Sequence, residues 1–348
     1  MSLTVLRNFI VVAGIAILMV ISGCDSSTTE PAATTSQSSP EIVETMPVEA
    51  DTSDQSITIM APAAPGGGWD QTARTMQMVI QENNLIGNVQ VVNVAGAGGT
   101  IGLAQVVNSQ QGNKDFYMVT GLIMMGAILT NESAVTLDQV TPIARLIGEY
   151  EVMVVPADSP YQTLADFIEA WKVDPGAMSI AGGSAGGSDH MLAGLLAQEV
   201  GVDVSLINYL PHSGGGESLA SLLGSHVAAG INGFAELKAF IESGRLRALA
   251  LSSEERVEGL NIPTFIEQGV NVHLANWRGV AAAPGITDQQ KENLVTLAEQ
   301  IYNTQTWRDA LVRNNWIDLF MTGPTYEAFL QSEGIRVDAV LRSIGLVK

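Results

Sequence analysis

The chain has 348 residues, of which 46% are apolar and 15% charged, and its formal net charge is -20. This apolar content excludes a wholly disordered protein, and the length suggests two domains. The excess of acid repels polyanions, which excludes a nucleic-acid partner, so any small anion that binds must be attracted by local groups.

The first residues are typical of an exported lipoprotein. An apolar run over 8–21 is too short to span a bilayer comfortably and matches the core of a signal peptide. Ile21-Ser22-Gly23-Cys24 then resembles the cleavage motif of bacterial lipoproteins. We expect a signal peptide over 1–23 and lipid on Cys24, with Asp25 retaining the protein on the outer face of the inner membrane. Cys24 is the only cysteine, so no intramolecular disulfide can form.

Residues 24–56 are expected to be a disordered acidic tether. They are mostly Ser, Thr, Pro, Ala and Glu, with no aromatic or basic residue and seven acids. Such a segment cannot bury enough surface to fold, and as a flexible coil it would reach about 30 Å.

From residue 57 onward, short β-branched runs alternate with helical stretches, which predicts an α/β fold. A strand, a glycine-rich loop and a helix follow one another four times, twice near the start of each half, and this indicates two similar lobes. The expected strands span 57–60, 89–94, 178–180 and 206–209; the loops 63–68, 96–99, 182–187 and 213–216; and the helices 69–81, 100–107, 188–200 and 217–223.

The glycine loops predict an anion site that needs no Lys or Arg. The first backbone N–H groups of a helix have no intrahelical partner and carry partial positive charge. Glycine lets that backbone approach a carboxylate or phosphate closely. Loops of this kind on facing lobes predict a ligand cleft between them, and Gly98, Gly99 and Gly215 are among its candidate residues.

Two other site types fit the sequence poorly. The segment 96–102 does not have the spacing of a dinucleotide loop, and no P-loop motif occurs. The four histidines, His190, His212, His226 and His273, lack metal-ligand spacing, so neither a cofactor nor a metal is expected.

A serine hydrolase is the alternative of a different class. Gly182-Gly183-Ser184-Ala185-Gly186 matches G-x-S-x-G between a strand and a helix. Asp203 and any of the three later histidines could complete a triad in the usual chain order. No oxyanion-hole segment precedes the motif, and a hydrolase would give the other three glycine loops no role. We therefore expect no enzymatic activity.

Two polar groups next to the loops have more than one interpretation. His190 lies in the first turn of its helix, where it either faces the ligand or pairs with Asp189. Asp70 and Arg74 stand four residues apart on the first helix, which is typical of an ion pair, and Asp70 could also complement the helix dipole or shape the loop.

Several of these segments together resemble a known family over about residues 57–348. The chain is similar to the extracytoplasmic solute receptors of tripartite tricarboxylate transporters, the TctC or Bug family. The matching segments are 61–70 with Ala73-Arg74, 92–102, Pro175-Gly176, 181–190, 222–227, 277–279 and Ala283-Pro284.

The resemblance implies a periplasmic-binding-protein-like fold of two Rossmann-like α/β lobes, joined by crossover strands, with the ligand cleft between them. It implies a monomeric periplasmic receptor that delivers a small di- or tricarboxylate to a permease of one large and one small membrane subunit. A sensory receptor of the same fold is an alternative. The family's backbone donors to the carboxylate map onto Gly66, Gly67, Gly68, Trp69, Asp70, Gly183, Ser184, Ala185, Gly186 and Ser188.

This sequence departs from the family pattern at two places. Trp69 stands where a small or hydroxyl residue is common, so it is expected to wall the pocket or to offer a flat apolar face. The segment 211–215, which contains His212, replaces a commoner Lys-Gly pattern. Both departures leave the identity of the carboxylate open.

Two extended runs mark where the chain crosses between lobes, 148–155 outward and 276–281 on return. We therefore expect a first domain of 57–155 plus 275–348, a second domain of 156–274, and C-terminal helices from Asp288 onward that pack on the first lobe. Arg278 is then the basic side chain expected near the cleft.

Overall fold

The computed structural model describes residues 55–348. The expected signal peptide, Cys24 and the expected tether up to residue 54 lie outside the described residues. The first strand begins at Ser56, one residue before the expected start, because the backbone of Ser56 already pairs with Asn88.

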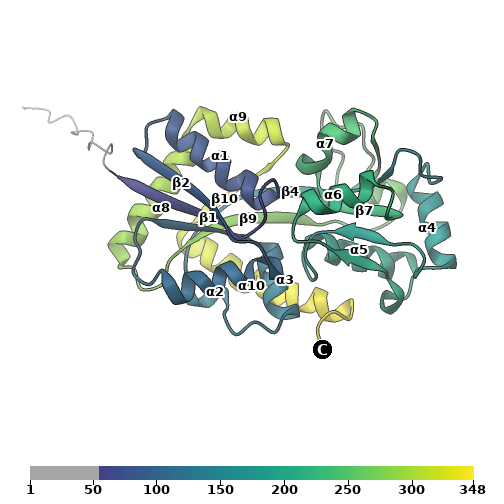
Figure 1. The fold of residues 1–348 in the computed structure, drawn as a ribbon, viewed down its shortest axis with the longest axis horizontal. Helices are drawn as coiled ribbons and strands as arrows, with labels where there is room; N and C mark the ends of the chain where they lie inside the picture. Colours follow the sequence, from purple (N-terminus) through teal and green to yellow (C-terminus); the bar gives the residue numbers. More distant parts are fainter. Residues whose placement is uncertain (1–54) are drawn as a thin grey trace, which may run out of the picture. The chain divides into compact units, whose positions relative to one another are not determined.

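The first lobe contains three parallel strands in the order β2-β1-β3, each followed by a helix (Figure 1). All residues of β3 are buried, as expected for a strand with helices on both faces of its sheet. The antiparallel strand β9 lies beside β3. The elements are β1 (Ser56–Ala61), α1 (Gly68–Glu82), β2 (Asn88–Asn93), η1 (Ala97–Gly99), α2 (Thr100–Ser109), β3 (Phe116–Gly121), α3 (Leu122–Thr130), η2 (Leu137–Gln139) and β9 (Ala275–Ala282).

The second lobe repeats this arrangement. Its parallel strands have the order β6-β5-β7, and the antiparallel strand β4 lies beside β7 as β9 lies beside β3. The elements are β4 (Thr141–Pro156), α4 (Leu164–Val173), β5 (Ile180–Gly182), α5 (Ser188–Val200), η3 (Val204–Leu206), β6 (Tyr209–Pro211), α6 (Gly215–Leu223), β7 (Ala229–Gly233), α7 (Phe234–Glu242), β8 (Leu246–Leu251) and η4 (Ile266–Gln268).

Strand β4 belongs to both lobes. Its residues 141–150 pair with β9, and its residues 151–156 pair with β7 and β8. The whole order, β2-β1-β3-β9-β4-β7-β5-β6, therefore runs from one lobe into the other through two paired crossover strands. This confirms the expected fold of two α/β lobes joined by crossover strands. The domain boundaries at 155/156 and 274/275 stay a prediction.

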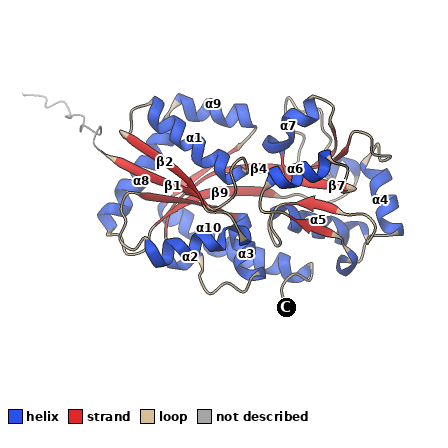
Figure 2. Cartoon of the chain, in the orientation of Figure 1, coloured by secondary structure: helices blue, strands red, loops and turns tan. Residues whose placement is uncertain are grey.

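Helices cover both faces of the sheet in each lobe (Figure 2). In the second lobe, α4 and α5 share one apolar cluster, while α6 and α7 contribute to another. The last elements are α8 (Asp288–Asn303), α9 (Gln305–Asn314), β10 (Ile317–Thr322) and α10 (Gly323–Ser343). None of the helices within 55–348 is long and apolar enough to cross a membrane.

The C-terminal helices divide between the lobes. Helices α8 and α9 contact α1 and pack in the apolar cluster of the first lobe, as expected. Helix α10 instead contacts both α3 and α5, and its Val337 and Leu341 are buried in the cluster that contains Leu192 of the second lobe. Helix α10 therefore packs on the first lobe, as expected, and also reaches the second lobe, because its apolar face spans both.

Two further local features differ from the sequence analysis. Strand β6 covers 209–211 instead of 206–209, because Val204–Leu206 forms a short helix whose start is capped by the Asp203 side chain. Each lobe also contains a third strand-to-helix connection, at Gly121 and at Gly233. The sequence analysis missed both because each has a single glycine and no glycine-rich loop.

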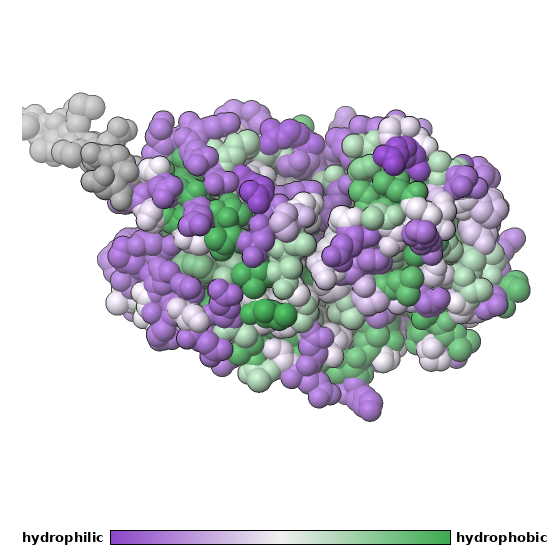
Figure 3. Space-filling model, in the orientation of Figure 1, coloured by the Kyte–Doolittle hydropathy of each residue, from purple (hydrophilic) through white to green (hydrophobic). Residues whose placement is uncertain are grey.

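The surface is chemically mixed. Figure 3 shows hydrophilic side chains over both lobes on one face, with apolar side chains scattered among them. The large apolar side chains that are exposed come from different elements and are Ile101, Val173, Leu206, Leu210, Val312 and Ile335.

Candidate ligand-binding site

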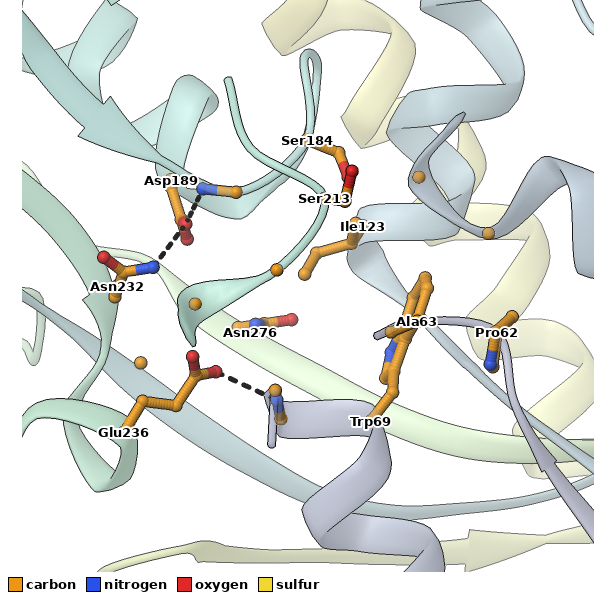
Figure 4. A pocket seen from close by; sticks show the side chains of 18 of the residues that line it. Pro62, Ala63, Trp69, Ile123, Ser184, Asp189, Ser213, Asn232, Glu236 and Asn276 are labelled. Atoms are coloured by element: carbon orange, nitrogen blue, oxygen red, sulfur yellow. Dashed lines mark hydrogen bonds between the residues drawn. The ribbon is translucent and has the colours of Figure 1, made fainter. Parts of the chain in front are cut away.

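A pocket lies where the strand-to-helix connections of the two lobes meet (Figure 4). Each of the six connections, or the first helical turn after it, contributes to the wall, because the carboxyl ends of parallel strands lie at one edge of a sheet. The cavity has a volume of about 50 Å³, enough for a few water molecules. The lining residues are Pro62, Ala63, Gly67, Gly68, Trp69, Gly96, Gly98, Gly99, Ile123, Gly183, Ser184, Asp189, Ser213, Gly214, Gly215, Asn232, Gly233, Glu236, Asn276 and Arg278.

Nine of the fifteen ligand-binding residues expected from the sequence line this pocket, and they come from both lobes. They are Gly67, Gly68, Trp69, Gly98, Gly99, Gly183, Ser184, Gly215 and Arg278. The other six belong to the same loops or helix starts but lie outside the lining, and they are Gly66, Asp70, Ala185, Gly186, Ser188 and His190. A role of these residues in binding stays a prediction.

Asp70 holds the first loop in place. Its carboxylate accepts hydrogen bonds from the Gly66 N–H at 2.8 Å, from Arg74 Nε at 2.9 Å and from Asn93 Nδ2 at 2.9 Å. Burial opposes its ionisation, but these three donors outweigh burial and hold the pKa of Asp70 below its ordinary value. The Asp70–Arg74 ion pair thus exists, and the same carboxylate also shapes the loop.

Asp189 has the equivalent task in the second lobe. It accepts hydrogen bonds from the Gly183 N–H at 2.6 Å, the Ser188 hydroxyl at 3.1 Å and Asn232 Nδ2 at 3.4 Å. Burial raises the pKa of Asp189 to about 6. The neighbouring Glu151 is fully buried, and burial, followed by repulsion from Asp189, raises its pKa well above the ordinary value. Burial and the neighbouring carboxyl group of Asp189 thus both oppose ionisation of Glu151.

His190 neither lines the pocket nor pairs with Asp189. Its Nδ1 accepts a hydrogen bond from the Gly186 N–H at 3.2 Å, and its ring stacks on Tyr209 with centroids 4.0 Å apart. Burial lowers the pKa of His190 to about 4, so the ring is neutral at pH 7. The histidine therefore supports the loop from behind, together with the Tyr209 hydroxyl, which donates to the Gly183 carbonyl at 2.9 Å.

Arg278 lines the pocket, as expected from the sequence, but its charge is already balanced. Its Nη2 forms an ion pair with Glu149, and the side chains of both residues are buried. Glu149 also accepts a hydrogen bond from the Ala235 N–H at 2.8 Å, at the start of α7. Arg278 Nε and Nη1 have no acceptor. A Cβ at Gly68 would overlap the guanidinium group, so the backbone of α1 approaches Arg278 where only glycine fits.

Glu236 links the lobes across the pocket. Its Oε1 accepts a hydrogen bond from the Gly68 N–H at 3.0 Å, which joins α7 of the second lobe to the first residue of α1 (Figure 4). Glu236 is half-buried as a residue, but its Oε2 has no hydrogen-bond donor and is out of reach of solvent. Burial, and next repulsion from Glu149, raises the pKa of Glu236 to about 8.

The sequence analysis missed Glu236, Glu149 and both pocket asparagines. Glu236 lies in the first turn after Gly233, so a search for strand-to-helix connections with a single glycine would have found it. Glu149 and Asn276 lie on the crossover strands, where the only polar residue singled out was Arg278.

The histidines do not assemble a hydrolase site at Ser184. Ser184 lines the pocket, and within 55–348 it forms no hydrogen bond with a histidine. His212 instead bonds to the Gly182 carbonyl at 3.1 Å and to Ser221 Oγ at 2.9 Å, and His273 pairs with the exposed Glu254. The part of the chain that the structure describes also contains no group of three or more acids, histidines or cysteines suited to a metal ion.

Known proteins resemble this chain in sequence and in fold. The model of the tripartite tricarboxylate transporter family receptor (TctC) matches residues 72–346. BugT of Bordetella pertussis is 29% identical over 316 residues, which cover 87% of this chain and 91% of BugT. The structure of the periplasmic binding protein BugD has a TM-score of 0.77 at 21% identity and covers 85% of this chain and 99% of its own.

A further solved structure contains a ligand. MatC from Rhodopseudomonas palustris with bound malate has a TM-score of 0.74 at 21% identity and covers 82% of this chain and 98% of its own. At such identities the two solved structures establish the fold alone, whereas the family model covers most of the described residues. The chain belongs to the TctC family of tripartite tricarboxylate transporter receptors.

Proposed function

We propose that this protein is a periplasmic receptor that captures a small di- or tricarboxylate between its lobes and performs no chemistry on it. The observation that carries the proposal is the convergence of six strand-to-helix connections, three from each lobe, on one pocket. Helix starts present backbone N–H groups and partial positive charge there, so they attract an anion that the acidic exterior repels.

Side-chain donors in the pocket support a carboxylate ligand. Trp69 Nε1, Arg278 Nε and Arg278 Nη1 are buried and have no acceptor. Because buried polar groups are normally hydrogen-bonded, a carboxylate that accepts from them would complete the site. The malate bound to MatC, a protein of the same fold, also supports this class of ligand.

The proposal includes delivery and attachment. The ligand passes to a permease of one large and one small membrane subunit, and lipid on Cys24 holds the receptor at the inner membrane. Strands β4 and β9 connect the lobes, so we infer that opening and closing bend these two strands.

The test is a thermal-shift panel of malate, citrate and succinate on the purified full-length chain. We expect at least one of them to raise the Tm, since a ligand at 100 times its Kd adds about 2.7 kcal/mol of stability. Trp69→Phe should weaken the binding of that ligand, because it removes the Nε1 donor. Trp171→Phe is the matched control, since Trp171 also lacks an acceptor but is buried in the second-lobe core. If no organic acid stabilises the chain, the proposal is wrong.

A further inference from the structure

The two lobes contact each other on both sides of the sheet, and the contacts on the two sides differ in kind. Figure 1 shows α1, α9 and α7 on one side of the sheet, and α2, α3 and α10 on the other. We call these the α7 side and the α10 side. Hydrogen bonds of single side chains join the lobes on the α7 side, whereas buried apolar side chains join them on the α10 side.

On the α7 side, two side chains of α7 bind helix ends in the first lobe. Glu236 accepts a hydrogen bond at 3.0 Å from the N–H of Gly68, the first residue of α1. Lys238 Nζ donates to Asn315 Oδ1 at 2.8 Å and lies 3.5 Å from the Arg313 carbonyl. Asn315 caps the C-terminal end of α9, where carbonyl groups lack intrahelical partners and a cation is favourable. Helix α7 thus binds one helix start and one helix end of the opposite lobe.

The contacts on the α7 side can be exchanged for water at little cost. Glu236, Lys238 and Asn315 are half-buried, and Arg313 is exposed. When the lobes separate here, water can take the place of each partner, and a protein hydrogen bond replaced by one to water changes the free energy only modestly.

On the α10 side, the same separation would expose apolar surface. Val337 and Leu341 of α10 are fully buried in the cluster that contains Leu192 of α5. Ile344, just after α10, packs so closely on Gly194 of α5 that a Cβ on this glycine would lie 2.8 Å from Ile344 Cδ1. Exposure of these side chains to water is unfavourable. Helix α10 is therefore held against the second lobe.

Helix α10 is also fixed to the strands that cross between the lobes. Trp277 of β9 donates from Nε1 to Glu333 Oε1 of α10 at 3.0 Å, and both residues are buried. The Trp277 ring packs edge-on against Phe329 of α10, with centroids 5.2 Å apart. Trp277 itself pairs with Gly148 of β4, close to the point where β4 passes from one lobe to the other. One helix thus holds the crossover strands and α5 together.

We propose that α7 is a latch and α10 a brace, so that the lobes open by separating on the α7 side while the α10 side stays packed. This inference rests on the opening and closing of the lobes in the proposed function and names the contacts that break. Lys238 is outside the pocket lining, so it stabilises the closed state without forming part of the wall around the ligand.

Distances between pairs of spin labels show which side opens. Pulsed electron paramagnetic resonance is applied to the purified full-length chain with Cys24→Ser, so that the introduced cysteines are the only thiols. Exposed positions 312 on α9 and 243 after α7 span the α7 side, and exposed positions 105 on α2 and 199 on α5 span the α10 side.

The variant Lys238→Met removes the cation of the latch. We expect the population with a longer distance across the α7 side to increase about two- to fivefold relative to the shorter one, the usual effect of one cation at a helix C-terminus. The distance across the α10 side should not change.

Two controls separate the latch from a general effect of lost surface charge. Lys291→Met is the matched control, because Lys291 also joins two helices, binding Glu327 of α10 at 2.6 Å, but lies on α8 of the first lobe. Glu236→Ala should act as Lys238→Met does, whereas Glu242→Ala, at the exposed far end of α7, should not.

Two results would overturn the inference. In the first, Lys238→Met leaves the distance across the α7 side unchanged. In the second, it lengthens the distances on both sides alike, so that α10 does not act as a brace. The measurement uses no ligand, so either result leaves the proposed function standing, and the thermal-shift panel tests that function separately.

Discussion

The substitution Glu236→Gln should change how the stability of this protein depends on pH. Burial and repulsion from Glu149 raise the pKa of Glu236 from 4.5 to about 8, opposed by Arg278. Between these values the folded state retains a proton that the unfolded state has released. The free energy of unfolding of the wild type therefore falls as pH rises, by up to about 1.4 kcal/mol per pH unit from this group. Glutamine does not titrate, and its amide oxygen can still accept from the Gly68 N–H.

Urea unfolding at pH 5.5, 6.5 and 7.5 measures this effect. All five tryptophans are buried, so their fluorescence reports loss of the core. The stability of the variant minus that of the wild type should increase by about 2–3 kcal/mol from pH 5.5 to 7.5. Buried Asp189 and Glu151 titrate in both proteins, so their contributions largely cancel in the difference. If this difference is the same at all three pH values, as expected for the exposed control Glu242→Gln, then solvent reaches the Glu236 carboxyl and the reasoning is refuted.

Gly68→Ala should destabilise the protein by about 2–4 kcal/mol in the same assay, because its Cβ displaces the Arg278 guanidinium from the buried ion pair with Glu149. Gly216→Ala, also in the first turn of a helix but with open space around it, should lower the free energy of unfolding by less than about 0.5 kcal/mol or should raise it. Equal losses of stability at both glycines would contradict this explanation. An active-site fluorophosphonate should leave the chain unlabelled, and labelling that Ser184→Ala abolishes would establish a hydrolase.

The sequence predicted the arrangement of the loops better than their chemistry. The strand, glycine loop and helix pattern places Gly68 and Gly183 at the ends of strands in two similar lobes, because local propensity and turn chemistry determine these features. The partner of Gly68 could not be predicted in the same way, since Glu236 follows it by 168 residues. Long-range pairs of this kind depend on how the lobes meet, and composition or periodicity carries no signal for it.

The sequence predicts that backbone N–H groups of the glycine loops, and not Lys or Arg side chains, bind an anionic ligand. The structure changes this prediction in one respect, which is the identity of the anions that these N–H groups already bind. Four loop or helix-start N–H groups beside the pocket already bind carboxyl groups of the chain itself. The pairs are Gly66 with Asp70, Gly183 with Asp189, Ala235 with Glu149, and Gly68 with Glu236. In the first three pairs, the carboxyl group lies in the same lobe as its N–H donor or on β4, which both lobes share. These three hydrogen bonds hold the loops in place. The fourth joins α1 to α7, so separating the lobes breaks this hydrogen bond and exposes both partners to water. A ligand that enters the pocket must therefore either retain that bond or replace it, so we expect its affinity to depend on the carboxyl group of Glu236 as well as on the glycines.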